Sequence, residues 1–183
     1  TKIISMGSGI NSKYPDYSPV ISLDGKALYF TSRRPWKNDE TEKFRDPLLN
    51  NYPEDIYISY RDEKGNWNEP KRLEFCEPSK NEATIAVNSD QKRIYVYEDL
   101  VGGGDIFFSE LKTKIFQRTE PLMIEGVNTK YWETHITVTI DGLNMYFTSD
   151  RPGGFGGRDI YRIVKLPDGT WSEPMNLGPT INT

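Results

Sequence analysis

The chain has 183 residues, a formal net charge of −4 at pH 7 and an aromatic content of 13%, and these totals exclude several classes of protein. The length suffices for one globular domain with its own core. Acidic and basic residues are mixed along the chain without a basic stripe, so nucleic acid is not expected as a partner. No apolar run approaches the roughly 20 residues of a membrane helix, so we expect no transmembrane segment in this chain.

An internal repeat is the main feature of the sequence. The first residues match only the end of a repeat unit. Residues 1–12 contain Met6-Gly7-Ser8-Gly9-Ile10-Asn11, which matches Leu177-Gly178-Pro179-Thr180-Ile181-Asn182 at the other end of the chain. We therefore expect residues 1–12 to be the closing strand of a preceding unit. The chain starts at Thr1 and ends on a motif boundary, and we read it as a piece of a longer protein.

The first full copy covers residues 13–75. It has an Asp24-Gly25 turn, then Leu28-Tyr29-Phe30-Thr31-Ser32, Asp55-Ile56-Tyr57 and Trp67-Asn68-Glu69-Pro70. Asp-Gly between two runs of strand-forming residues is a hairpin signal, because these residues tolerate the positive φ that such turns need. Residues 36–54 form an insertion that the last copy lacks. We expect an exposed loop there, with partner binding as the alternative.

The second copy, residues 76–129, is the most divergent, and the third, residues 130–183, is the most regular. In the second copy Asp90-Gln91 replaces the Asp-Gly turn, and Phe116 takes the place of the tryptophan. In the third copy Asp141-Gly142, Met145-Tyr146-Phe147-Thr148-Ser149, Asp159-Ile160-Tyr161 and Trp171-Ser172-Glu173-Pro174 follow in order.

These patterns predict an all-β fold. Each copy provides four short antiparallel strands in about 50 residues, the length of one β-propeller blade. Strands with large apolar residues in succession, such as Leu28-Tyr29-Phe30, suit a sheet covered on both faces by neighbouring blades. We predict one partial propeller domain over residues 1–183, with three blades and a leading closing strand.

The motifs also resemble a known family. Ser-x-Asp-Gly, Leu-Tyr-Phe-Thr-Ser, Arg-Pro, Asp-Ile-Tyr and Trp-x-Glu-Pro are similar to the WD40-like, TolB-type propeller repeat called PD40. The stretches Asp150 to Tyr161 and Asn176 to Thr183 resemble the version found in OmpA-family and PorE-like envelope proteins of Bacteroidota. The resemblance implies a six-bladed ring, a periplasmic location associated with the outer membrane, and envelope proteins or further blades as partners. It also implies a link to peptidoglycan anchoring or type IX secretion.

Several polar and aromatic residues recur from copy to copy, and recurrence favours a structural role. We expect Arg33 or Arg34 to pair with Asp55, and Arg151 or Arg158 to pair with Asp159. The recurring residues assigned to this structural motif are Arg34, Asp55, Asp105, Arg151, Asp159, Trp67 and Trp171.

A second set gives binding candidates. Asp16, Glu82 and Glu133 precede the first strand of each copy, where they could ring a channel mouth and attract a cation or a basic ligand. The alternatives are a solvated rim or hydrogen bonds to backbone amides of a neighbouring blade. His135, Tyr131, Trp132 and Trp36 complete the set, and Tyr14, Tyr131 and Trp132 could stack on sugar rings.

No catalytic or metal motif is evident. His135 is the single histidine and Cys76 the single cysteine, and we expect Cys76 to be a small apolar filler. The loop from Asp150 to Asp159 lacks the ligand pattern of an EF-hand. We therefore predict no cofactor and no enzyme activity, and together with the repeat and the resemblance this implies a protein-interaction module of the cell envelope. The alternatives are a glycan-binding module or the propeller domain of a hydrolase.

Overall fold

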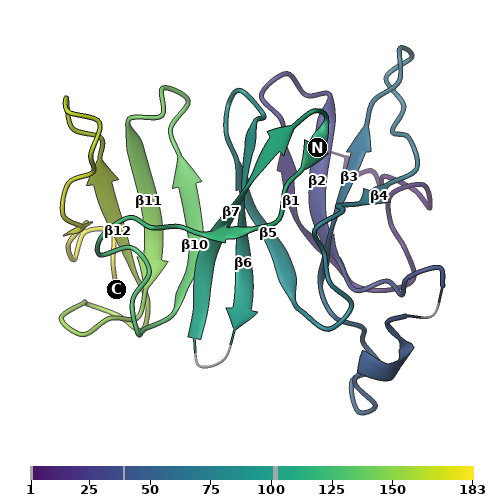
Figure 1. The fold of residues 1–183 in the computed structure, drawn as a ribbon, viewed down its shortest axis with the longest axis horizontal. Helices are drawn as coiled ribbons and strands as arrows, with labels where there is room; N and C mark the ends of the chain where they lie inside the picture. The colour runs from purple at the N-terminus through teal and green to yellow at the C-terminus, as the bar shows by residue number, and fades with distance from the viewer. Residues whose placement is uncertain (1, 39, 101–102) are drawn as a thin grey trace. The chain divides into compact units, whose positions relative to one another are not determined.

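The computed structural model describes residues 2–38, 40–100 and 103–183, and in this part of the chain the strands form three antiparallel sheets in chain order (Figure 1). The first sheet has the order β1 (Asp16–Ile21), β2 (Ala27–Ser32), β3 (Asp55–Tyr60), β4 (Lys71–Arg72). The second has β5 (Glu82–Val87), β6 (Arg93–Leu100), β7 (Gly103–Lys112), β8 (Ile115–Phe116), and β9 (Glu120–Pro121) also pairs with β7. The third has β10 (Glu133–Val138), β11 (Asn144–Ser149), β12 (Asp159–Val164), β13 (Met175–Asn176).

The prediction of all-β, four-stranded blades is confirmed, with one extra short strand in the second sheet. The extra strand β8 pairs Leu111 with Phe116. Isolated bridges join Arg61 to Trp67 and Lys165 to Trp171 at the same point of the other sheets. Phe116 therefore occupies the tryptophan position, as the alignment predicted.

The leading segment differs from its prediction, since residues 2–12 form no strand in the structure. The closing strands β4 and β13 are only two residues long and exist by pairing with β3 and β12. The described residues provide no third strand next to residues 2–12, so the segment has nothing to pair with.

The insertion 36–54 contains a short 3-10 helix, η1 (Glu42–Phe44), and Asp39 within it lies outside the described residues. Residues 101 and 102 of the second blade also lie outside them. In the described ranges we find no helix with the length and apolar character needed to cross a membrane.

The turns between the first two strands of each sheet have the predicted geometry. Gly25 and Gly142 have φ of 69° and 70°, and Gln91 has φ of 57° at the equivalent position. Each of these residues donates its N–H to the carbonyl three residues earlier, at 2.8–2.9 Å. The second copy thus keeps the turn although a side chain replaces glycine in a left-handed conformation.

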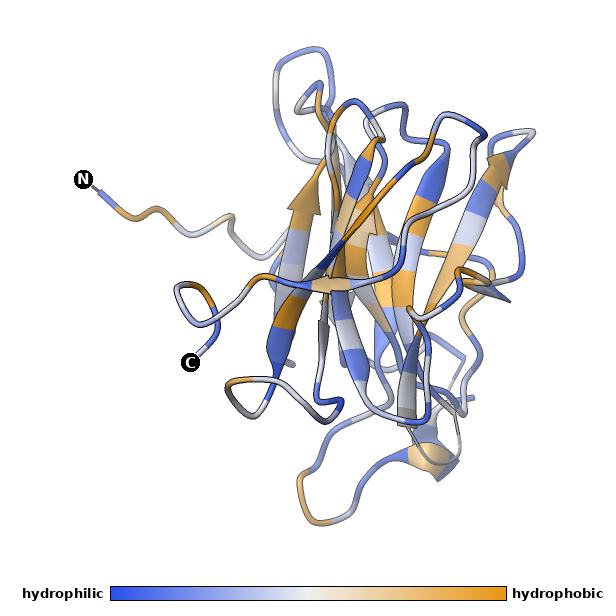
Figure 2. Cartoon of the chain, turned by 90° about the vertical axis from the view of Figure 1, so that its left-hand side faces the viewer, coloured by the Kyte–Doolittle hydropathy of each residue, from blue (hydrophilic) through white to orange (hydrophobic). Residues whose placement is uncertain are grey.

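The chain divides into two compact units, residues 1–84 and residues 85–183. In the first unit, Leu28, Phe30 and Tyr57 form one face of the sheet, and Ile10 of the leading segment covers them together with Trp67. Figure 2 shows bands of apolar and polar residues along several of the strands that it draws. The leading segment is therefore anchored at Ile10, while Ile3 and Ile4 before it remain 96% and 75% exposed.

The second unit holds a larger core built from two sheets. Tyr95 and Ile106 of the second sheet belong to the same buried cluster as Phe147 and Ile163 of the third. Val127, in the connection between the two sheets, is completely buried in this cluster. Face-to-face packing of consecutive blades, which the apolar strands predicted, is thus present in this unit.

An asparagine fastens each closing connection to the third strand of its sheet. Asn128 accepts a hydrogen bond from Ile106 N at 2.9 Å and donates to Ile106 O at 2.8 Å. Asn182 does the same with Ile160 N and O, at 2.8 and 3.1 Å. In the first sheet Cys76 takes this place, since its Sγ lies 3.4 Å from Ile56 N and accepts its hydrogen bond.

We predict that Asn128→Ala lowers the free energy of unfolding by about 1–3 kcal/mol, because it leaves the buried N–H of Ile106 without its acceptor. Urea denaturation measures the change. Asn66→Ala, in an exposed turn, is the matched control and should stay within about 0.5 kcal/mol of the wild type. Equal effects of the two substitutions would contradict this role for Asn128.

Candidate functional site

The two most complete copies share a carboxylate–arginine contact at the start of the first strand. In the first copy, Asp16 Oδ1 lies 2.8 Å from Arg34 Nη2, and Asp16 Oδ2 accepts the N–H of Ser12 at 2.6 Å. Arg34 also donates to Ser32 Oγ and to Ile10 O, at 2.8 and 2.9 Å. Its guanidinium lies over the ring of Tyr57, 4.7 Å from the centroid. One arginine thus joins β1, the end of β2 and the leading segment.

The third copy repeats this arrangement almost atom for atom. Arg151 Nη2 lies 3.2 Å from Glu133 Oε1, Arg151 Nε donates to Ser149 Oγ at 2.9 Å, and Glu133 Oε2 accepts the N–H of Thr129. Arg151 also donates to the carbonyls of Gly126 and Val127, and its guanidinium lies 4.8 Å from the Tyr161 ring centroid. The Ser-x-Arg-Pro sequence places the arginine two residues after the strand, from where it reaches back to the acid.

The second copy keeps the acid but not the motif's arginine. Glu82 is buried at the start of β5, and its Oε1 accepts the N–H of Glu77 at 3.3 Å. At the sequence position of Arg34 and Arg151 this copy has Leu100. Glu98 replaces the serine that ends the second strand, since Glu98 pairs with Asp105 as Ser32 pairs with Asp55.

The predicted arginine pairs of Asp55 and Asp159 are wrong. Arg34 and Arg151 turn back to the acid of the first strand, while Arg33 pairs with Glu54. The aspartates accept hydrogen bonds from backbone N–H groups, the Asn176 amide and the Trp36 indole instead. Asp159 accepts hydrogen bonds from Phe155 N, Gly156 N and Asn176 Nδ2, at 2.6–2.9 Å. Although burial opposes this, these bonds hold the pKa of Asp159 below its usual value.

Asp55 and Asp105 lie in different surroundings from Asp159. Asp55 Oδ2 accepts the indole N–H of Trp36 at 2.7 Å, and burial raises the pKa of Asp55 to about 7. Burial, and then the charge of Glu133, raise the pKa of Asp105. Trp36 is buried, so it anchors the insertion to the sheet.

The three acids proposed as a channel-mouth ring do not form a solvated rim, because Glu82 and Glu133 are buried and Asp16 is partly buried. Each accepts a backbone N–H from the connection before its strand: Ser12, Glu77 and Thr129. The alternative of hydrogen bonds to backbone amides of a neighbouring blade agrees with this geometry for Asp16 and Glu133, whereas Glu77 lies in the same predicted copy as Glu82. Their role in binding a cation or a basic ligand stays a prediction.

The other binding candidates of the third copy lie near its exposed surface. Trp132 is 45% exposed, and Arg158 lies over its ring, 5.1 Å from the centroid. His135 has an exposed side chain, and its Nδ1 lies 2.9 Å from Thr134 Oγ1. Partial desolvation of the ring, and then the charge of Arg158, lower its pKa. Tyr131 is partly buried beside Lys130. Trp132, His135 and Arg158 thus form one small aromatic and cationic patch.

The remaining aromatic candidates pack within the units. Trp67 borders the apolar face of the first sheet, and Arg61 lies over its ring. Trp171 packs against the core of the second unit. Tyr14 meets Tyr52 edge-on at 5.5 Å.

A groove of about 670 Å³ lies in the first unit, and the sequence alone did not indicate it. Its lining includes Ser8 and Gly9 of the leading segment and, from the sheet and the insertion, Arg34, Trp36, Lys37, Tyr57, Pro70, Lys71 and Arg72. Arg34, Lys37, Lys71 and Arg72 are cationic and only Glu69 is acidic, in a protein of net charge −4. One feature of the sequence could have indicated the groove. Arg72 pairs with Tyr57 in the first sheet, at the position where Asn176 pairs with Tyr161 in the third, so the first copy has a cation in place of an amide.

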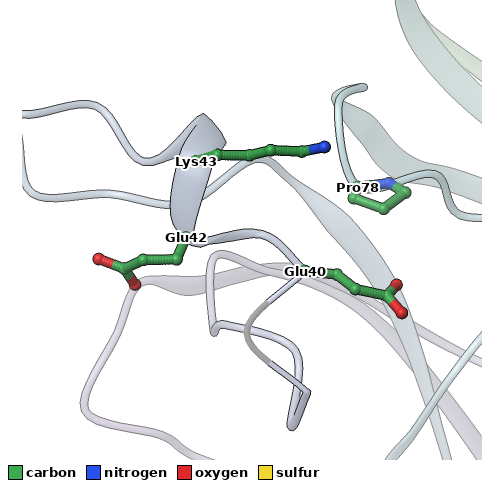
Figure 3. Close-up of a pocket in the computed structure, with 4 residues that line it drawn as sticks. All are labelled: Glu40, Glu42, Lys43 and Pro78. Atoms are coloured by element: carbon green, nitrogen blue, oxygen red, sulfur yellow. The ribbon is translucent and has the colours of Figure 1, made fainter.

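A second hollow, of about 660 Å³, lies between the insertion and Pro78. Figure 3 shows Glu40 and Lys43 extending toward Pro78, whereas Glu42 points away from it. Glu42 accepts hydrogen bonds from Tyr52 and Arg45, which lower its pKa. The charged groups diverge, so this hollow is a weaker site than the groove.

Neither a family model nor a curated protein sequence matches this chain. Solved structures do match it. TolB from Acinetobacter baumannii is 20% identical with a TM-score of 0.52, over 90% of this chain and 33% of TolB. A protein assigned as TolB from Agrobacterium tumefaciens is 16% identical with a TM-score of 0.56, over 92% of this chain and 51% of that protein.

Prolyl oligopeptidase B from Galerina marginata also matches, at 15% identity and a TM-score of 0.55, over 92% of this chain and 20% of that protein. The chain thus spans about a third and about half of the two TolB structures, and less of the peptidase. At these identities the likeness shows the fold: the chain is all-β and resembles β-propeller domains. The matched proteins include a peptidase, so the likeness does not separate enzymes from binding modules.

We predict that Arg151→Met lowers the free energy of unfolding by about 3–5 kcal/mol, because it leaves the fully buried carboxylate of Glu133 without its counter-ion. Chemical denaturation measures this, and the double variant with Glu133→Gln should recover part of the loss. Lys37→Met is the control: its pair with Glu69 is 93% and 81% exposed, so the change should be about 0–1 kcal/mol. A loss for Arg151→Met no larger than that of the control would refute the structural role.

The hydrogen bonds of Asp16 also predict how the free energy of unfolding depends on pH. Burial alone would raise the pKa of Asp16, but hydrogen bonds from Ser32, Arg34 and Ser12 outweigh it and lower the pKa. The stabilisation by Asp16 is therefore complete above the pKa of the unfolded state, about 3.9, and is lost as the pH falls through the lower folded pKa. Asp16→Asn should destabilise at pH 7, and the difference from wild type should shrink below about pH 4. Denaturation curves from pH 2 to 7 measure it, and a difference that stays the same from pH 7 to pH 2 would contradict this role for Asp16.

Proposed function

We propose that this chain supplies non-catalytic β-propeller blades that bind another protein of the cell envelope, in the periplasm and associated with the outer membrane. The groove of the first unit is the observation that carries the proposal. It lies where the first copy departs from the repeat, between the leading segment, the insertion and β4. Its excess of cationic side chains favours an extended, acidic segment of the partner protein.

The recurring polar residues support a non-catalytic role, because their hydrogen bonds are used to join segments of the chain. In the described residues, His135 has a hydroxyl neighbour and no hydrogen-bonded carboxylate to orient it as a base. Catalytic groups would be expected at positions that do not repeat, and to converge on one pocket. The groove offers cations and aromatic rings but no such set.

The proposal includes further blades in a six-bladed ring. The leading segment has the hydrogen bonds of a closing connection: Asn11 N binds Gly7 O at 2.9 Å, as Asn182 N binds Gly178 O. Asn11 Nδ2 donates to Ser5 Oγ at 3.1 Å, as Asn182 Nδ2 donates to Asn176 Oδ1. Exposed Ile3 and Ile4 then correspond to residues that close a sheet, which favours a third strand from another blade as their cover.

The envelope location, the OmpA-family context and the link to peptidoglycan or type IX secretion rest on the resemblance of the sequence motifs. A glycan-binding module is the second candidate, and the half-exposed ring of Trp132 next to Tyr131 favours it. If this patch binds sugars, Trp132→Ala should abolish binding on a glycan array and leave peptide binding in the groove intact.

We predict that a fluorescent acidic peptide binds the groove. The double substitution Lys37→Glu with Lys71→Glu should lower the affinity for this peptide about tenfold, or by about 1.4 kcal/mol of binding free energy. Both lysines are exposed, so folding should not change. Fluorescence anisotropy at two salt concentrations measures the affinity, which should fall as salt rises. Lys26→Glu with Lys64→Glu is the matched control, at exposed positions that do not line the groove. Equal loss in both double variants, or equal affinity for a neutral peptide, would contradict the assignment.

A further inference from the structure

Three potential metal ligands converge in the first unit, in a group that we call the junction cluster: Asp55, Cys76 and Glu82. Asp55 begins β3, Cys76 lies in the connection after β4, and Glu82 begins β5. One ligand atom from each residue lies within 4.8 Å of the others. The three side chains are almost fully buried, at 0%, 5% and 1% exposure.

One oxygen of the cluster lacks a hydrogen-bond donor. Asp55 Oδ2 accepts the indole N–H of Trp36, but Asp55 Oδ1 is buried without a hydrogen-bond partner among the described residues. Leaving a buried carboxylate oxygen unsatisfied is costly. Asp159 of the third copy differs, since both of its oxygens accept hydrogen bonds. Asp105 Oδ1 of the second copy is also buried without a hydrogen-bond partner among the described residues, but no thiol has been found beside it there.

The repeat shows that the thiol is the unusual member. Where the other copies have Asn128 and Asn182, whose amides make two hydrogen bonds each to a backbone isoleucine, the first copy has Cys76. A thiol is a poorer hydrogen-bonding group than an amide, so it fastens the connection less well. It offers a soft ligand in exchange, which an asparagine cannot do.

We propose that the junction cluster binds a divalent cation of the zinc class through Cys76 Sγ and one carboxylate oxygen each of Asp55 and Glu82. Thiolate with carboxylate is a donor set for zinc, whereas magnesium and calcium take oxygen ligands. Ligands about 2.0–2.3 Å from zinc lie about 3.5 Å apart. The three atoms lie within 4.8 Å of one another, so each pair needs to approach by at most about 1.3 Å.

The charges of the site support this assignment. A thiolate and two carboxylates carry −3, and the nearby Arg72, whose charge acts on both Asp55 and Cys76, contributes +1. A divalent cation brings the sum to zero in a buried site. Binding releases to solvent the thiol proton of Cys76 and the proton of Asp55 in molecules where that carboxyl is protonated, because zinc takes the thiolate and the carboxylate. The bound ion would fasten β3 to the connection after β4 and to the start of β5, the task that Asn128 performs in the second copy.

The full chain, stripped with EDTA and dialysed, tests the proposal with Co²⁺ and Zn²⁺. Co²⁺ should produce a sulfur-to-cobalt charge-transfer absorption band, and Zn²⁺ at about 100 times its Kd should raise the Tm by about 5–10 °C. Cys76→Asn is the matched variant, since it restores the residue used by the other copies and should fold. It should lose both the band and the shift.

Asp55→Asn is the second variant and should weaken Co²⁺ binding at least tenfold while keeping the Trp36 hydrogen bond. The wild type failing to show either the band or the Zn²⁺ shift would overturn the proposal. So would a band of equal strength in Cys76→Asn, which would place the metal elsewhere. A Tm shift by Mg²⁺ equal in wild type and Cys76→Asn would also refute a thiolate site.

Discussion

The arginine that reaches back from the end of the second strand to a buried acid organises each regular copy. Arg151 holds Glu133, Ser149 and two carbonyls of the preceding connection, and its flat face covers Tyr161. A carboxylate with no exposed surface would be unstable without this partner. The planar guanidinium suits the task because it donates in several directions while its face rests on an aromatic ring. One side chain thereby fixes the order in which connection, first strand and second strand meet.

This contact also explains how the apolar core of the second unit is sealed. Val127, whose carbonyl accepts from Arg151, is completely buried against Phe147 and Tyr161 in the cluster shared by the second and third sheets. The hydrogen bonds of Arg151 and the apolar packing of Val127 involve the same connection between the second and third sheets. The hydrogen bonds therefore hold Val127 in the core, and the packing holds its carbonyl near Arg151. In the first unit Ile10 and Arg34 repeat the combination with Phe30 and Tyr57. The leading segment thus makes the same contacts with the first sheet that the connection before β10 makes with the third sheet, although residues 2–12 form no strand.

Much of the fold could be predicted from the sequence, because strands, turns and the Phe116 replacement are local or periodic properties. The acidic partners of Arg34 and Arg151 could not be predicted from the sequence. Alignment shows which residues recur, but Arg34 lies between two recurring acids, Asp16 and Asp55, and only the path of the side chain selects Asp16. The prediction that Cys76 is a small filler agrees with its 5% exposure, but the hydrogen bond from Ile56 N to its Sγ was not foreseen. Its connection is shorter than those of Asn128 and Asn182, since Cys76 follows the buried Leu73 by three residues, and this hides the equivalence until the hydrogen bonds to Ile56 are seen.

The two proposed sites of the first copy, the groove and the junction cluster, both lie where this copy departs from the repeat, and they meet at Trp36 and Arg72. Trp36 donates its indole N–H to Asp55 of the junction cluster, and Arg72 lies over its ring, 3.1 Å from the centroid. Trp36 and Arg72 also line the groove. A ligand carboxylate in the groove that draws Arg72 toward itself removes positive charge from beside Asp55 and Cys76. If the cluster binds a cation and the groove binds an acid, as proposed, the two sites would be coupled through Arg72, because both ligands would depend on the position of its charge.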